Sequence, residues 1–138
     1  MLRYESFCAT IDYGTRGVKC TSSDSVVSML PMGHIYGLAF EFLYPLCNGA
    51  TIWFLGKTPS PSRLLKAMKD VRPYMVCTVP LVMEKISRSS IKPALERKPV
   101  NILKHIPIVR KSVFRKVREK VLEAFGGNVK TFIMGGAA

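Results

Sequence analysis

Metal-binding patterns are missing from this sequence. It has four cysteines, which lie far apart and form no Cys-x-x-Cys pair: Cys8, Cys20, Cys47 and Cys77. Its only histidines are His34 and His105. No spacing typical of a zinc site can be built from these residues. We therefore expect no metal site, and four free cysteines buried in apolar surroundings.

Long apolar runs are also missing. No stretch reaches the roughly 18 uninterrupted apolar residues of a membrane-spanning helix. The first residues include Glu5 and no apolar core, unlike a signal peptide. With 138 residues and 48% hydrophobic content, the chain can build the core of a single domain. We expect a soluble, cytoplasmic protein.

Acidic residues are scarce, with 9 Asp and Glu against 21 Lys and Arg. The imbalance is local, because residues 85–120 hold twelve Lys and Arg against two Glu, which is +10 of the net +12. Such a patch can bind phosphate groups or anionic lipid headgroups. The alternative is an ordinary solvated helix face with its leading loop. No nucleic-acid-binding motif is present, and Phe114 is the only aromatic residue within the patch.

Strand and helix patterns alternate along the chain. Apolar runs bounded by turn residues predict four strands, at 26–30, 50–55, 74–79 and 129–134. Apolar residues at helical spacing predict helices at 4–13, with Gly14 as a stop, and at 35–46, 61–71, 81–86 and 112–125. Prolines cut residues 87–111 into an irregular basic connection. This order predicts an α/β fold, a parallel sheet with helices on both faces.

The segment after the first strand is the first candidate site. The strand ends at Pro31, and the turn that follows carries His34 and Tyr36 into an unusually apolar helix whose only charge is Glu41. Ligands of parallel α/β sheets bind beyond the carboxyl ends of the strands. His34 could therefore contact a ligand, or it could only cap the helix.

The exit of the last strand is the second candidate. All parallel strands end at the same edge, so the turns at His34, Gly56, Pro80 and Gly135 should lie in one row. The polar turn at His34 and the glycines Gly135 and Gly136 are joint candidates for one ligand site. The alternative for the glycine pair is an ordinary tight turn.

Five segments in order resemble the adenylate-forming acyl-CoA synthetase superfamily of AMP-binding enzymes. They are Leu30-Pro-Met-Gly-His-Ile-Tyr-Gly37, Gly49-Ala-Thr-Ile52, Val71-Arg-Pro73, Val79-Pro80 and Gly135-Gly136-Ala137. The resemblance covers essentially the whole chain. The long basic connection is most similar to that of long-chain fatty acid:CoA ligases. The fold it implies is a flavodoxin-like sub-sheet of the large N-terminal domain of such enzymes.

The resemblance implies a two-step reaction that uses ATP, Mg²⁺ and CoA. A fatty acid carboxylate attacks the α-phosphate of ATP, and CoA then displaces AMP from the acyl-adenylate. His34 matches the position that orients the acyl carboxylate, with Tyr36 and Gly37 in the substrate pocket. Gly135, Gly136 and Ala137 match the segment lying against adenine. Glycines let a flat base approach the backbone, and an imidazole can hydrogen-bond a carboxylate.

Several motifs of that superfamily are missing from the sequence. There is no Gly-x-Pro-Lys loop and no Tyr-Gly-x-Thr-Glu segment. We therefore expect residues 1–138 to be one fragment of the N-terminal domain, working with the remainder of a parent enzyme and inactive alone.

Two other functions stay open from the sequence. The first is a non-enzymatic module that binds nucleic acid or an anionic membrane through residues 85–120. Peripheral membrane contact of a ligase through this patch also stays open, whereas nucleic acid is not favoured. The second is a complete flavodoxin-like binding protein, for which Met32-Gly33-His34 would be a poor phosphate-binding turn.

Overall fold

A computed structural model describes residues 3–93, 115 and 118–135 of the chain. Four parallel strands form one sheet: β1 (Ser25–Ser28), β2 (Thr51–Phe54), β3 (Met75–Thr78) and β4 (Thr131–Met134). Their order across the sheet is β2-β1-β3-β4. The predicted parallel α/β fold is confirmed, and this order is the flavodoxin-like one.

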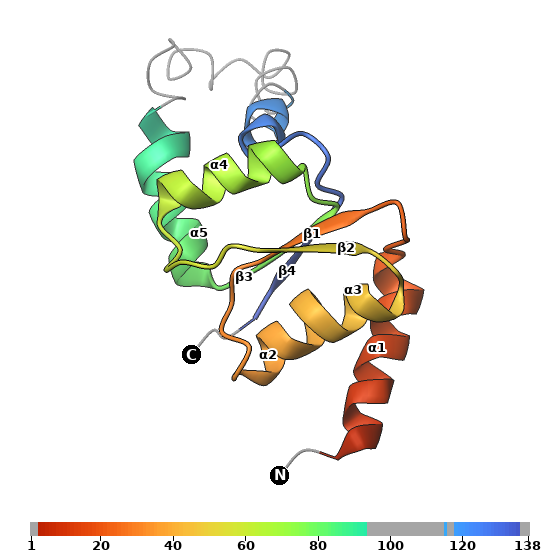
Figure 1. The fold of residues 1–138 in the computed structure, drawn as a ribbon. Coiled ribbons are helices and arrows are strands. Elements are labelled where there is room, and N and C mark those ends of the chain that lie inside the picture. The colour runs from red at the N-terminus through yellow and green to blue at the C-terminus, as the bar shows by residue number, and fades with distance from the viewer. Residues whose placement is uncertain (1–2, 94–114, 116–117, 136–138) are drawn as a thin grey trace, which may run out of the picture.

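Helices cover both faces of the sheet (Figure 1). One face carries α1 (Tyr4–Val18) and a single helical segment made of α2 (Ile35–Gly37), the π-helix η1 (Leu38–Leu43) and α3 (Tyr44–Cys47). The other face carries α4 (Pro61–Val71), α5 (Pro80–Ile86) with its π-helical extension η2 (Ser87–Ile91), and a helix over residues 118–124.

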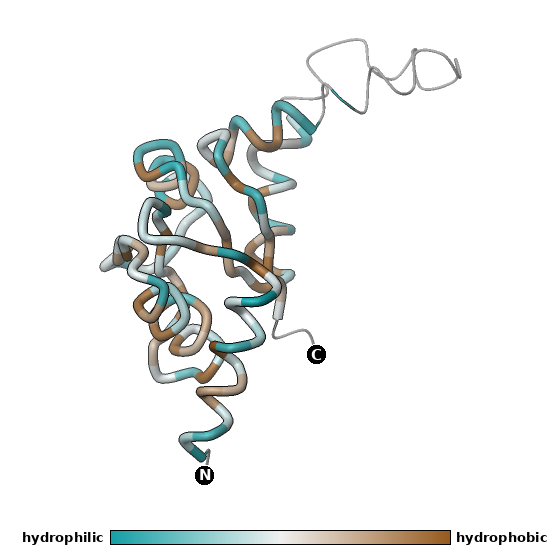
Figure 2. The backbone as a smooth tube through the Cα atoms, turned by 90° about the vertical axis from the view of Figure 1, so that its right-hand side faces the viewer, coloured by the Kyte–Doolittle hydropathy of each residue, from teal (hydrophilic) through white to brown (hydrophobic). Residues whose placement is uncertain are grey.

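The core has two layers because successive strand residues point to opposite faces. Val27 and Val76 pack with Leu64, Met68 and Phe125 on the α4 side. The layer on the other side contains Cys20, Val26, Tyr44, Ala50, Met75 and Cys77. In Figure 2 hydrophobic residues recur through the centre of the molecule, whereas the start of α1 is hydrophilic. β1 and β3 are therefore central strands buried on both faces.

Helix α1 continues past the expected stop at Gly14. Gly14 is buried, and a Cβ there would come within 2.8 Å of the Tyr44 ring. The glycine is thus a packing residue that lets α1 approach α3, and tertiary contact outweighs its low helix propensity. Lys19, in the left-handed region at φ 57°, ends the helix instead.

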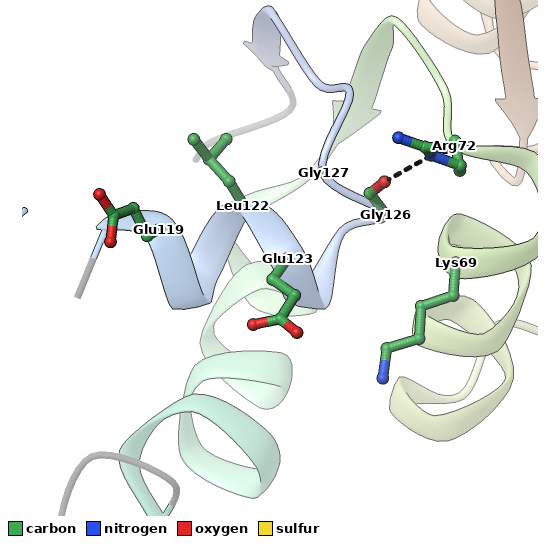
Figure 3. A pocket seen from close by; sticks show the side chains of 7 residues that line it. All are labelled: Lys69, Arg72, Glu119, Leu122, Glu123, Gly126 and Gly127. Atoms are coloured by element: carbon green, nitrogen blue, oxygen red, sulfur yellow. Dashed lines mark hydrogen bonds between the residues drawn. The ribbon is translucent and has the colours of Figure 1, made fainter. Parts of the chain in front are cut away.

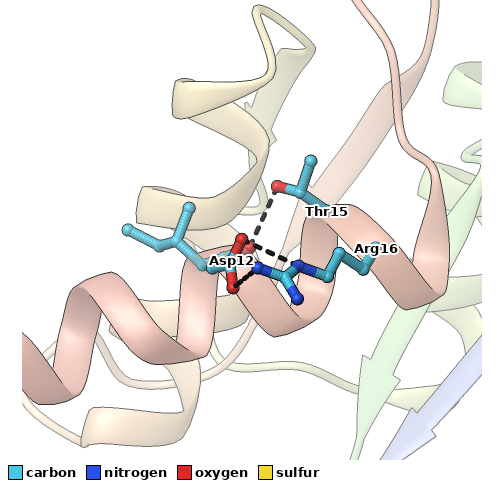
Figure 4. A network of polar contacts seen from close by, with 4 residues as sticks. Asp12, Thr15 and Arg16 are labelled. Atoms are coloured by element: carbon cyan, nitrogen blue, oxygen red, sulfur yellow. Dashed lines mark hydrogen bonds and ion pairs between the residues drawn. The ribbon is translucent and has the colours of Figure 1, made fainter.

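The exposed side of α1 carries a local polar network (Figure 4). Arg16 and Asp12 are one turn apart, with Nη2 of the arginine 2.7 Å from Oδ2 of the aspartate. The Thr15 hydroxyl donates to the carbonyl of Ile11 at 2.9 Å. Exposed pairs one turn apart contribute only about 0.3–0.5 kcal/mol, so this network supports the helix and suggests no site.

Two further expectations need correction. Cys20 and Cys77 are buried, but Cys8 and Cys47 are exposed because α1 and α3 turn these positions toward solvent. The expected irregular connection over 87–111 begins as helix, since no glycine or proline interrupts residues 81–92 and η2 extends α5. Residues 94–111 lie outside the described part of the chain.

Candidate functional site

The strand order places a topological switch point between the ends of β1 and β3. After β1 the chain crosses one face to reach β2, and after β3 it crosses the other face to reach β4. The carboxyl edge at such a switch point is where open α/β sheets bind ligands. The turn carrying His34 leaves β1 at this point.

His34 caps the helix that follows β1. Its Nδ1 accepts the backbone N–H of Tyr36 at 3.2 Å, and the residue is exposed. The capping alternative from the sequence is therefore what the structure contains. A neutral imidazole whose Nδ1 accepts a hydrogen bond carries its proton on Nε2. The cap thus leaves an exposed Nε2–H donor at the sheet edge, so capping and ligand binding are compatible.

Tyr36 follows β1 and contacts the ends of β3 and β4, so it joins three strand ends. Its hydroxyl lies 2.7 Å from the carbonyl oxygen of Ile133 and 3.2 Å from that of Thr78. A Cβ at Gly135 would be 3.1 Å from its ring. Burial, and then the neighbouring Cys77, raise the pKa of Tyr36 to about 12, so the hydroxyl stays a donor at neutral pH.

The structure therefore brings two predicted positions, Tyr36 and Gly135, into contact. His34 lies two residues before Tyr36, so the exits of β1 and β4 lie close together (Figure 1). Gly37 is buried, and a Cβ there would come within 2.8 Å of the Pro31 carbonyl oxygen. It holds the helix close to the turn rather than facing a described pocket. Gly136 and Ala137 lie outside the described residues.

Sequence reasoning did not assign a role to Glu41. Its side chain is completely buried, and Oε2 accepts the N–H groups of Met29 at 2.8 Å and Leu30 at 2.7 Å. Burial raises its pKa to about 7, although these backbone donors act in the opposite direction. The sequence did contain a sign of its importance, because Glu41 is the only charged residue in an otherwise apolar helix.

An open hollow of about 620 Å³ lies elsewhere, between α4 and the helix before β4 (Figure 3). It is lined by Lys69, Arg72, Glu119, Leu122, Glu123, Gly126 and Gly127. These residues precede β3 and β4, so the hollow lies at the amino edge of the sheet, opposite to His34. Its charges are mixed, and Arg72 already donates through Nε to the Gly126 carbonyl oxygen at 3.1 Å. We do not assign a ligand to it.

Within the part of the chain that the structure describes, no group of three His, Cys, Asp or Glu side chains could hold a metal ion. No helix among those residues is long and apolar enough to cross a membrane.

Most of the basic patch, residues 85–120, falls outside the described part of the chain. Its described members include Arg88, paired with Glu84 at 2.5 Å, and Arg115, paired with Glu119 at 3.8 Å. All four of these side chains are exposed.

Comparison with known proteins decides the family. The family model described as "AMP-binding enzyme" matches residues 1–138. The chain belongs to the AMP-binding enzyme family. No curated relative matches the sequence. The AMP-binding family includes acyl-CoA ligases, so the resemblance found in the sequence is confirmed at this level, whereas a long-chain fatty acid ligase is not.

Solved structures show the same fold. ATP-bound MatB from Rhodopseudomonas palustris matches with a TM-score of 0.63 and 19% identity, over 99% of this chain and 21% of that protein. A malonyl-CoA ligase in a ternary product complex with methylmalonyl-CoA and AMP matches with a TM-score of 0.61 and 20% identity, over 96% and 23% of the two chains. This AMP-binding chain thus spans about a fifth of the length of the structures it matches.

The contacts of Tyr36 with the ends of β3 and β4 lead to a testable prediction about stability. Removing its hydroxyl in Tyr36→Phe leaves the carbonyl oxygens of Ile133 and of the buried Thr78 without that donor, so we expect a loss of about 1–2 kcal/mol in unfolding free energy. Urea denaturation of the chain measures it. Tyr13→Phe is the matched control, because Tyr13 is 73% exposed and should change stability by less than about 0.5 kcal/mol. Equal effects of the two changes would show that Tyr36 does not join the strand ends.

Proposed function

We propose that this chain is one segment of a longer ATP-dependent fatty acid:CoA ligase, which forms an acyl-adenylate and transfers the acyl group to CoA. The observation that carries the proposal is the meeting of the β1 and β4 exits at the carboxyl edge of the sheet, through Tyr36 against Gly135. Membership of the AMP-binding family supports the nucleotide part. The fatty acid part rests on the resemblance of the basic connection to that of long-chain ligases.

His34 is the residue that would orient the acyl carboxylate. Because Nδ1 is already used by the helix cap, Nε2–H is the group that would donate to a carboxylate oxygen. An imidazole donor at this place can align the carboxylate for attack on the α-phosphate of ATP. Correct alignment of two bound reactants removes a large part of the entropic barrier to their reaction.

Gly135 would lie against the adenine of ATP, together with Gly136 and Ala137. The absence of a side chain at Gly135 fits this role, because the ring of Tyr36 already occupies the space on one side of its backbone. A flat base could then approach that backbone closely. Bound ATP supplies the phosphate that activates the carboxylate.

Magnesium and CoA are also proposed for the longer enzyme. The described residues hold no metal-ligating cluster, so Mg²⁺ would bind through the phosphates of ATP and through residues outside this segment. The chain also lacks the Gly-x-Pro-Lys loop that could neutralise charge on those phosphates. For this reason the 138-residue chain alone should not catalyse ATP–pyrophosphate exchange.

The role of His34 is tested in the enzyme that carries this segment. Loss of a hydrogen bond to a charged group costs about 1.5–3 kcal/mol, so His34→Ala should lower kcat/KM for the fatty acid roughly 10- to 100-fold. His34→Asn should recover part of this loss, because its amide can both accept the cap bond and donate to the carboxylate. Initial rates of fatty-acid-dependent AMP formation measure the effect.

The His34→Ala experiment has a matched control and two outcomes that would contradict the proposal. His105→Ala, the other histidine of the chain, should leave the rate unchanged. Unchanged activity in His34→Ala would remove the proposed role of His34. A wild-type enzyme that uses malonate and rejects palmitate would keep the ligase assignment but contradict the fatty acid assignment.

A further inference from the structure

Glu41 holds the backbone where the chain leaves β1. The regular strand ends at Ser28, and the next two residues, Met29 and Leu30, donate their N–H groups to one oxygen of this carboxylate. These residues directly precede Pro31, which has no N–H to offer. A side chain from the following helix thus replaces the strand partner that the backbone has lost.

The same turn is fixed from its other end. The His34 N–H donates to the Pro31 carbonyl oxygen at 3.0 Å, and the absence of a side chain at Gly37 lets the helix touch that carbonyl. The path from β1 to His34 is therefore held by Glu41 on one side and by Gly37 on the other. Any movement of the Met29–Leu30 backbone would shift His34.

A carboxylate is a costly choice for this position. Glu41 is completely buried, and its second oxygen, Oε1, makes no hydrogen bond, although the nearby Ser28 side chain offsets a small part of the effect of burial on its pKa. The titratable groups that face it are Cys77 from β3 and Tyr36 from α2, and burial raises the pKa of both, so neither supplies charge at neutral pH. No cation pairs with it in the described part of the chain. A leucine would fill the space more cheaply, which suggests that the acceptor itself is needed.

We propose that Glu41 is a positioning residue, whose carboxylate fixes the turn after β1 and thereby the direction in which His34 presents Nε2–H. The importance of that direction rests on the proposed function, because His34 is the group assigned to the acyl carboxylate. Glu41 itself is too deeply buried to touch a substrate and acts only through the backbone.

Protonation of Glu41 can distinguish a positioning role from a role in packing alone, because only the first depends on the hydrogen bonds of the carboxylate. Because Oε2 already accepts two N–H bonds, a proton taken up by Glu41 would bind Oε1. The neutral acid is a weaker acceptor than the carboxylate. With a pKa of about 7 for this group, the amide protons of Met29 and Leu30 should change their environment across neutral pH.

The test is amide exchange and ¹⁵N NMR on the 138-residue chain. In Glu41→Leu the amides of Met29 and Leu30 should exchange at least about tenfold faster, while those of Val76 and Cys77 in the central strand β3 change much less. Glu41→Gln keeps an acceptor, so it should restore most of the protection but abolish the change in chemical shift of these amides near pH 7. Glu5→Gln, at an exposed position in α1, is the matched control and should behave as wild type.

Two results would overturn the proposal. One is equal acceleration of exchange at Met29, Leu30 and the β3 amides, which would mean that Glu41 only supports global stability. The other is a wild-type chain whose Met29 and Leu30 amides show the same pH dependence of chemical shift as those of Glu41→Gln. If Glu41→Leu does not fold, the wild-type titration and Glu41→Gln still decide the question. None of these readouts needs ligase activity, so failure of the proposed function would be recognised separately by His34→Ala.

Discussion

The unfolding free energy of the chain is expected to fall by about 3 kcal/mol between pH 4.5 and pH 7 because of Glu41. Burial raises the pKa of this carboxyl from 4.5 to about 7. Each unit of difference in pKa between the folded and the unfolded chain changes the unfolding free energy by about 1.4 kcal/mol. In this range the folded chain keeps the proton while the unfolded chain has released it. The stabilisation is complete below pH 4.5 and is lost as pH rises through 7.

Urea denaturation at several pH values measures this effect as a difference between variants. Glu41→Gln removes the titrating group, so its stability should lack the fall that the wild type shows. Glu5→Gln should follow the wild type, because Glu5 is exposed. Parallel wild-type and Glu41→Gln curves between pH 4.5 and 8 would show that Glu41 titrates as in an unfolded chain, and hence is not buried as described.

The second large effect is expected from Gly126→Ala, which should cost about 3 kcal/mol of unfolding free energy. Gly126 has φ +89°, where an L-residue is strained by about 1–2 kcal/mol. A Cβ there would also lie 2.1 Å from the Met68 carbonyl oxygen. Because that atom is backbone, relief requires α4 to move away from the helix before β4, which adds about 1–3 kcal/mol.

Gly127 offers a matched control for this change. It has φ +78°, but a Cβ there would have no atom within 4 Å. Gly127→Ala should therefore cost only the backbone strain, about 1 kcal/mol. Chemical denaturation of both variants separates strain from overlap. Equal losses would mean that α4 and the helix before β4 do not pack as closely as described.

The positions of most strands and helices could be predicted from the pattern of apolar residues, because helices cover both faces of the sheet. Strands such as Met75–Thr78 read as unbroken apolar runs, and prolines mark the starts of α4 and α5. Ser60 occupies the N-cap position before Pro61, but its side chain makes no cap hydrogen bond. Gly14 misled the sequence reasoning because its role depends on a contact with Tyr44, thirty residues away.

The candidate site was only partly accessible to sequence reasoning. The row of strand exits follows from a parallel sheet, so the neighbourhood of His34 and Gly135 could be expected. The contact that joins them could not, because Tyr36 reaches across β3 to Ile133, 97 residues later. The same holds for Glu41, whose partners are backbone groups that no side-chain pattern reveals.

The most direct test of the central claim, that this chain is part of an ATP-dependent acyl-CoA ligase, is to sequence the coding region on both sides of it. We expect a Gly-x-Pro-Lys loop shortly upstream and a Tyr-Gly-x-Thr-Glu segment downstream in the same reading frame. Those segments would supply the phosphate-binding groups that these 138 residues lack. Start and stop codons bounding the segment would contradict the claim and leave a family member without its catalytic groups.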